Sequence, residues 1–262
     1  MSTPMLTATI EGIGFWTTGL PTWAAARAFA AGSGGTLETP ARPASQLLAA
    51  NERRRAPDTV AVSLEVALAA CQDAGRDPST LPSVFASTHG DLAITDYMCA
   101  TLADDPLAIS PTKFHNSVHN AAAGYWTIGA GATAAATAIS AHQASFAQGL
   151  LEALSQLAAG EAAVLLAGYD NRSAGPLGRV SHSDGLLGGA LVLGAAALPG
   201  KPRLRVRLGD GPADAGNGAL ARHAAGNARA PMLPLFDALA AGAGGCVLDA
   251  GGGRCLVVEL TA

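Results

Sequence analysis

Residues 137–170 constrain the fold more than any other part of this chain. Small and β-branched residues over 133–139 predict a strand. Residues 144–159 carry apolar side chains at helical spacing and predict a buried helix. Residues 162–167 are apolar and end in Ala167-Gly168, which predicts a second strand. A strand, a helix and a strand in this order indicate an α/β protein.

The turn before the predicted helix reads Ser140-Ala141-His142-Gln143. The first turn of a helix has unpaired N–H groups and partial positive charge, which favour a thiolate or a developing oxyanion at that place. Gln143 cannot use this field for covalent chemistry, because an amide does not take an acyl group from a thioester at neutral pH. It can donate and accept hydrogen bonds. Taken alone, Gln143 is equally an ordinary polar residue at a helix start.

Composition limits the possible functions. The chain has 262 residues, of which 49% are hydrophobic, so it can bury a full core. Only 14% are charged, against about a quarter in ordinary soluble proteins, which indicates that a partner covers part of the surface. The net charge of -4 argues against nucleic-acid binding. The basic cluster Arg53-Arg54-Arg55 is read as a solvated approach to a helix, with a phosphate or carrier-protein patch as the alternative.

No window reaches the roughly 20 apolar residues of a membrane span, and the N-terminal residues lack a signal-peptide pattern. We therefore expect a cytoplasmic protein without a membrane span. The cysteines lie in apolar or helical runs without metal-ligand spacing: Cys71, Cys99, Cys246 and Cys255. We expect core thiols, no bound metal and no cofactor.

Periodicity predicts further elements in the first half. Residues 6–13 alternate as a strand. A helix follows, with Asp58 or Thr59 as its N-cap and Gly75 as its C-terminal stop. Residues 83–87 predict a short strand that opens onto a turn and a helix reaching Asp104.

The second half is patterned less strongly. Residues 183–193 form a glycine-rich apolar segment, and residues 203–208 alternate as a strand. Residues 245–249 and 255–260 predict a hairpin across three glycines. Residues 209–231 are rich in Gly and Ala and remain unassigned.

Together these features resemble β-ketoacyl synthases from the first strand to about residue 193. In that family a cysteine begins the helix, and the next strand ends in a similar Ala-Gly. Counting back from Gly160 and from Ala167-Gly168 places Gln143 at the cysteine position. The pattern Asn120, Ala123-Gly124 resembles the synthase segment that precedes the cysteine strand.

More narrowly, residues 110–114 and 117–124 resemble chain length factors of the aryl polyene type. These short proteins are similar to the N-terminal half of a synthase and pair with a complete synthase. The resemblance implies a single thiolase-like α/β domain over 1–262, with a mixed five-stranded sheet between helices in 1–195 and a reduced completion in 196–262. It also implies a heterodimer with an active β-ketoacyl synthase and indirect contact with an acyl carrier protein.

The resemblance further suggests which residues reach the acyl tunnel. We expect Tyr97, Met98 and Thr101 on the helix after Gly90 to shape it, together with Gln143, His142 and Asn120. A condensing synthase also needs two histidines in its second half. Only His182 and His223 follow Gln143, and neither lies in the expected motif. The resemblance therefore implies a non-catalytic chain length factor.

Two other functions remain open. The chain could be an acyl-thioester hydrolase or transferase that uses Ser140 or Ser145 with His142, since a hydroxyl and an imidazole could converge there. It could also be a homodimeric acyl-binding scaffold. No Gly-x-Ser-x-Gly elbow, Walker loop or dinucleotide fingerprint supports an unrelated enzyme class.

Overall fold

The computed structural model describes residues 5–242 and 244–261. Their strands form one mixed sheet with the order β3-β2-β4-β5-β1-β6-β8-β7. β2 is parallel to β3 and β4, and all other neighbours are antiparallel. The strands are β1 (Leu6–Thr17), β2 (Ser83–Ala86), β3 (Ala136–Ile139), β4 (Ala163–Asp170), β5 (Leu187–Gly194), β6 (Arg203–Asp210), β7 (Gly244–Gly251) and β8 (Arg254–Thr261).

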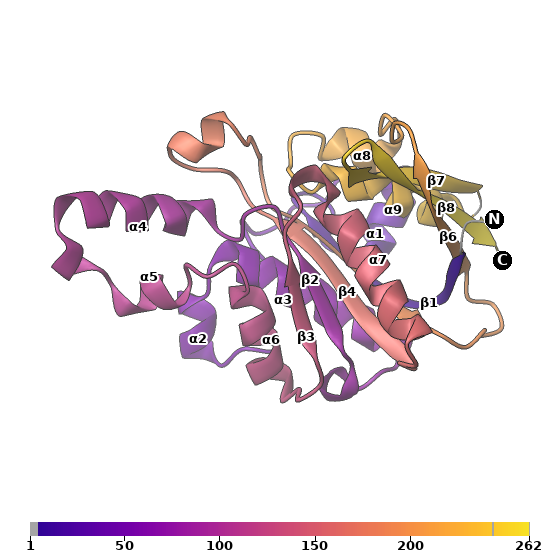
Figure 1. Ribbon diagram of the computed structural model, residues 1–262, viewed down its shortest axis with the longest axis horizontal. Coiled ribbons are helices and arrows are strands. Elements are labelled where there is room, and N and C mark those ends of the chain that lie inside the picture. Colours follow the sequence, from indigo (N-terminus) through magenta and orange to yellow (C-terminus); the bar gives the residue numbers. More distant parts are fainter. Residues whose placement is uncertain (1–4, 243, 262) are drawn as a thin grey trace.

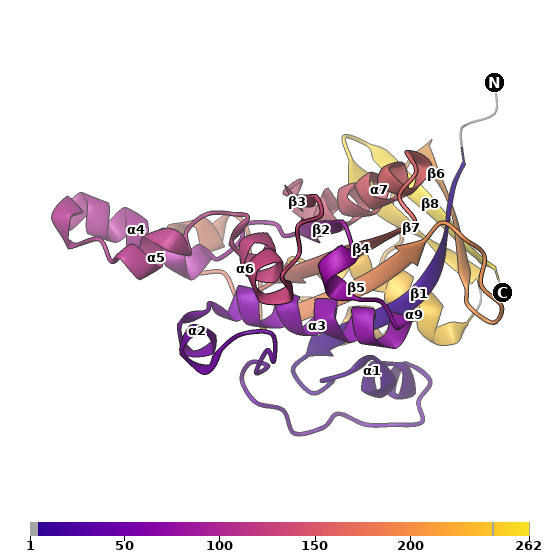
Figure 2. The same cartoon turned by 90° about the horizontal axis from the view of Figure 1, so that it is seen from below.

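Helices cover both faces of this sheet (Figures 1 and 2). α3 and α6 pack on one face, and α7 and α9 pack on the other. The helices are α1 (Trp23–Ala30), α2 (Ala50–Arg55), α3 (Asp58–Ala74), α4 (Leu92–Asp104), α5 (Pro111–His115), α6 (Ala121–Ala130), α7 (Ser145–Ala158), α8 (Ala219–His223) and α9 (Leu233–Ala241).

Strand alternation explains the two layers. Leu166 on β4 packs with α7, whereas its neighbour Leu165 packs with α3 and α6. β1 does the same with Phe15 and Trp16, so this strand continues past residue 13, where the sequence pattern placed its end. Gly14 makes the layer possible, because a Cβ there would lie 1.9 Å from the Val66 carbonyl oxygen of α3.

The sheet has eight strands rather than five, although the five strands expected within residues 1–195 are present. Residues 6–194 contribute the five strands β1 to β5, and the C-terminal section adds β6, β8 and β7 to the same sheet. The join is made by the first residues of β1, which pair with β6 while the later ones pair with β5. A strand that pairs on both sides cannot be recognised from local periodicity.

The sequence predictions for α7, β4 and the β7–β8 hairpin are confirmed. α7 and β4 lie where the helix and second strand were expected, and the glycine turn joins β7 to β8. Gly75 ends α3 with φ 63°. The N-cap prediction was wrong: Pro57 precedes the helix, and Asp58 is its first residue and pairs with Arg42.

α4 and α5 project beyond the layers as an arm at one end of the molecule (Figure 1). Within the described residues, no helix combines the length and the hydropathy needed to cross a bilayer.

Candidate functional site

A tight turn links β3 to α7 and shapes the candidate site. It is a single 3₁₀ turn, His142–Ala144, in which His142 has φ 54°, the one positive φ of a non-glycine residue in the described chain. Ser145 Oγ accepts a hydrogen bond from Ala141 N at 2.8 Å and donates one to His142 O at 2.7 Å. These bonds hold the turn in a conformation that L-residues rarely adopt.

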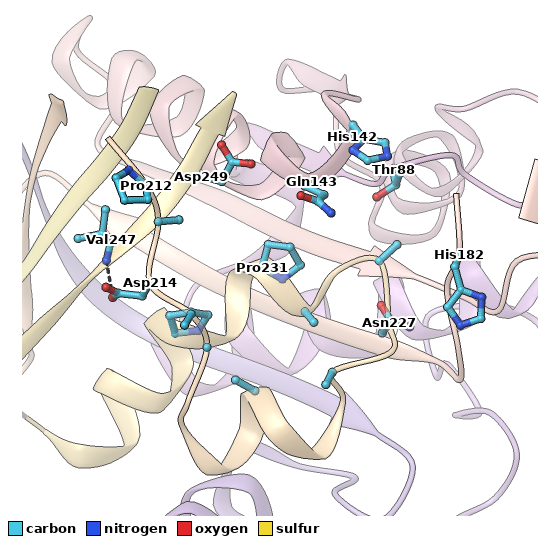
Figure 3. A pocket seen from close by; sticks show the side chains of 18 of the residues that line it. Thr88, His142, Gln143, His182, Pro212, Asp214, Asn227, Pro231, Val247 and Asp249 are labelled. Carbon is cyan, nitrogen blue, oxygen red and sulfur yellow. Dashed lines mark hydrogen bonds between the residues drawn. The ribbon is translucent and has the colours of Figure 1, made fainter. Parts of the chain in front are cut away.

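A cavity of about 720 Å³ lies beside this turn (Figure 3). His142 and Gln143, both exposed, contribute to its wall together with Thr88. The loop after β6 contributes Pro212 and Asp214. The remaining lining residues include Val180, Ser181, His182, Asn227, Pro231, Val247, Asp249 and Arg254.

An ion pair lies beneath the cavity. Arg229, fully buried, donates from Nε to Asp170 Oδ2 at 3.1 Å, and Asp170 is also buried. Asp170, the last residue of β4, also accepts from Ser87 Oγ at 2.7 Å and from the backbone N–H and hydroxyl of Thr88. The carboxylate therefore joins the carboxyl ends of β2 and β4.

Arg229 extends the same network to the turn. Its Nη2 donates to Thr88 Oγ1 at 2.6 Å and to the His142 carbonyl oxygen at 3.1 Å. Asn227 supports it by accepting from Arg229 N and donating to Asp184 O. Sequence reasoning missed this cluster because Arg229 lies in the weakly patterned segment 209–231. A carboxylate at the end of an apolar strand was the one available signal.

Three histidines surround the network. His89 Nε2 lies 2.5 Å from Ser181 Oγ, and its ring lies 6.5 Å from that of His142. His119 Nε2 donates to Ser87 O at 3.0 Å. Burial is the main cause that lowers the pKa of His89; the Asp170 carboxylate opposes the shift, and His142, His119 and Arg229 add to it.

The cysteines do not contribute to the cavity wall. Burial, with a smaller contribution from Asp77, raises the pKa of Cys71 to about 12, and burial with Asp214 does the same for Cys246. Cys255 is buried in β8, whereas Cys99 is exposed on α4, so the expectation of core thiols was wrong for Cys99. None of them lines the cavity. The described residues hold no cluster of three or more His, Cys, Asp or Glu side chains suited to a metal ion.

The other predicted site residues lie elsewhere. Asn120 is exposed ahead of α6. Tyr97, Met98 and Thr101 are half-buried on the α4 arm, where the Tyr97 hydroxyl accepts from Ser110 N at 3.2 Å. None of these four lines the cavity of this single chain.

The alternative nucleophiles are committed to the backbone. Ser140 Oγ donates to Thr88 O at 2.8 Å, and Ser145 Oγ is held within the turn. Of the two later histidines, His182 lines the cavity and pairs with Asp184, whereas His223 lies against Thr18 O.

Comparison with known proteins identifies the architecture. The family model of the beta-ketoacyl synthase N-terminal domain matches residues 23–207, more than half of the chain. No curated protein sequence matches the chain. Several hundred chains of solved structures match it.

Three of the similar structures have chains of nearly the same length. One is the ketosynthase ApeO in complex with its chain length factor ApeC from Xenorhabdus doucetiae (TM-score 0.76, 23% identity, 97% of this chain and 99% of that chain). Another is AntDE:AntF, a type II PKS acyl-carrier protein in complex with its ketosynthase (0.74, 12%, 99% and 100%). The third is the ishigamide ketosynthase/chain length factor (0.68, 16%, 97% and 99%). These likenesses confirm the thiolase-like α/β ketosynthase fold.

The buried ion pair generates a stability prediction. Asp170→Asn or Arg229→Met should each lower the free energy of unfolding by about 3–5 kcal/mol, because each leaves one buried charge without its counter-ion. Urea denaturation measures the change. Asp58→Asn, which breaks the half-exposed pair with Arg42, is the control and should cost at most about 1 kcal/mol. Equal losses for Asp170→Asn and Asp58→Asn would contradict the assigned role.

Proposed function

Because the chain belongs to the β-ketoacyl synthase family, we propose that it is a non-catalytic chain length factor. In this role it pairs with an active β-ketoacyl synthase and shapes the acyl tunnel in polyene or fatty-acid-like biosynthesis. One observation carries the proposal: the turn directly before α7 presents Gln143, an amide, and counting back from Gly160 and from Ala167-Gly168 assigns this position to the family's nucleophilic cysteine.

The geometry around Gln143 supports this interpretation. The turn is strained at His142 and braced by Arg229, as a positioned nucleophile would require. An amide in that place cannot carry an acyl group. None of the native thiols lines the cavity, and burial holds two of them protonated. The turn therefore has the shape of a reactive elbow without its chemistry.

Two surfaces support the pairing. β3 pairs only with β2 among the described strands, so its other edge is free to extend into a partner's sheet. Large exposed apolar side chains lie on α6, on the α4–α5 arm and on the loop that follows β4. They are Leu102, Leu107, Phe114, Val118, Ile128, Leu177 and Val180. Apolar surface of this extent indicates a protein interface.

Residues 196–262 serve as the reduced completion of a single ketosynthase-like domain, because β6, β8 and β7 continue the sheet of the first half. The carrier protein delivers the acyl chain to the synthase subunit. A homodimer of this chain is the competing assembly, and the pairing experiment distinguishes it.

The pairing makes a surface prediction. Ile128 is 74% exposed on this surface. The variant Ile128→Asp should therefore leave the isolated chain folded, but it should prevent co-purification with a co-expressed synthase of the same gene cluster. Leu37→Asp changes a leucine with 55% exposure outside this surface and should pair normally. The proposal is refuted if the wild-type chain stays monomeric in the presence of the synthase, or if it forms only homodimers.

Replacing Gln143 tests its role at the elbow. Gln143→Cys should create a thiol that iodoacetamide alkylates at least as fast as Cys99, because Gln143 is exposed at a helix start. The variant should still not condense acyl and malonyl thioesters alone, since the family's second-half histidine motifs are missing. Peptide mass spectrometry separates the two thiols. Condensation by Gln143→Cys without the synthase would overturn the non-catalytic assignment.

The tunnel residues carry a separate expectation. We propose that Tyr97, Met98 and Thr101 of α4 reach the tunnel only when the arm packs on the partner. In the single chain all three are half-buried, and none of them lines the cavity. In the reconstituted complex, Met98→Ala should lengthen the product by removing bulk. Chromatography of the products measures this, with Leu37→Ala as the control. An unchanged product distribution from an intact complex would exclude Met98.

A further inference from the structure

A hydroxyl and an imidazole meet at the cavity wall, outside the turn that carries Gln143. Ser181 Oγ lies 2.5 Å from His89 Nε2. Ser181 follows a 3₁₀ turn, Pro176–Arg179, and its N–H donates to Leu177 O. His89 follows β2 next to Thr88. Ser181 lines the cavity together with Thr88 and Gln143, and His89 contacts Ser181 through its Nε2.

The surroundings of His89 suit a general base. Its pKa lies below the ordinary value of 6.5, with burial as the main cause, so the ring is neutral at pH 7. The charged and titratable groups near it are Asp170, which opposes this shift, and His142, His119 and Arg229, which add to it. With the ring proton on Nδ1, Nε2 accepts the hydrogen bond of the Ser181 hydroxyl.

We propose that Ser181 and His89 form a nucleophile and base that cleave acyl thioesters or esters entering this cavity. Ser181 Oγ forms a bond to the carbonyl carbon while His89 Nε2 takes the hydroxyl proton. The bond from that carbon to the sulfur of a thioester, or to the alkoxy oxygen of an ester, then breaks, and protonated His89 gives its proton to the departing group, which leaves as a thiol or an alcohol. Water then hydrolyses the acyl-serine, releases the acid and regenerates the pair.

The cavity provides the space and a donor for this reaction. Its volume of about 720 Å³ falls in the usual range for small-molecule sites, roughly 300–1,000 Å³. Gln143 lines it with a side-chain amide that makes no hydrogen bond to the described residues, so this amide is available to a developing oxyanion. Ser140 and Ser145, by contrast, donate to backbone carbonyls. The activity requires no synthase and goes beyond the proposed pairing, in which the chain is non-catalytic in the sense that it performs no condensation.

A fluorophosphonate probe tests the pair on the full chain. The probe should phosphonylate Ser181, located by peptide mass spectrometry, and the protein should hydrolyse p-nitrophenyl butyrate and a butyryl thioester of N-acetylcysteamine. Ser181→Ala should abolish both signals, and Ser140→Ala should keep them. His89→Gln should slow labelling by about 100-fold or more, the usual loss for a general base.

The pH profile provides a second readout. Only neutral His89 can accept the proton, so the labelling rate should be constant near pH 7 to 8 and should fall as pH drops through a pKa below 6.5. Circular dichroism and co-purification with the synthase show whether each variant is folded. Absent labelling, labelling of another serine, or equal labelling in folded Ser181→Ala would overturn the proposal and leave the pairing intact.

Discussion

The ion pair between Arg229 and Asp170 is the interaction on which the site depends. Moving two charges out of water costs several kcal/mol each, so such a pair persists only where further hydrogen bonds support it. Here Asp170 accepts hydrogen bonds from Ser87 and Thr88. Arg229 donates hydrogen bonds to Thr88 and to the carbonyl oxygen of His142. The pair thereby ties together the ends of β2 and β4, the turn before α7 and the C-terminal section.

The conformation of the turn before α7 does not depend on a reactive side chain. The strained His142 and the turn around it are held by hydrogen bonds between backbone atoms and the side chains of Ser145 and Arg229, so the side chain at position 143 is not needed for them. Under the proposed assignment, Gln143 removes the covalent chemistry and leaves this geometry in place. A subunit with this geometry can still form the surface that a homologous partner packs against, which is consistent with the proposed pairing.

The low charge content has a structural counterpart. A chain with 14% charged residues must leave apolar groups on its surface, and here they gather on α6, the α4–α5 arm and the loop after β4. The arm extends away from the sheet and its covering helices (Figure 2). Burial in the proposed assembly would remove this apolar surface from water.

The sequence by itself determined the parts whose cause is local. The apolar spacing of α7, the continuous apolar run of β4 and the glycine turn between β7 and β8 each reflect neighbouring residues, and periodicity found them. Counting from Gly160 also located Gln143 at the helix start. Tertiary structure decided the rest. β1 joins both halves of the sheet, and Arg229 meets Asp170 across 59 residues. Such pairings are set by how layers pack, because no local pattern records which distant side chains share a buried space.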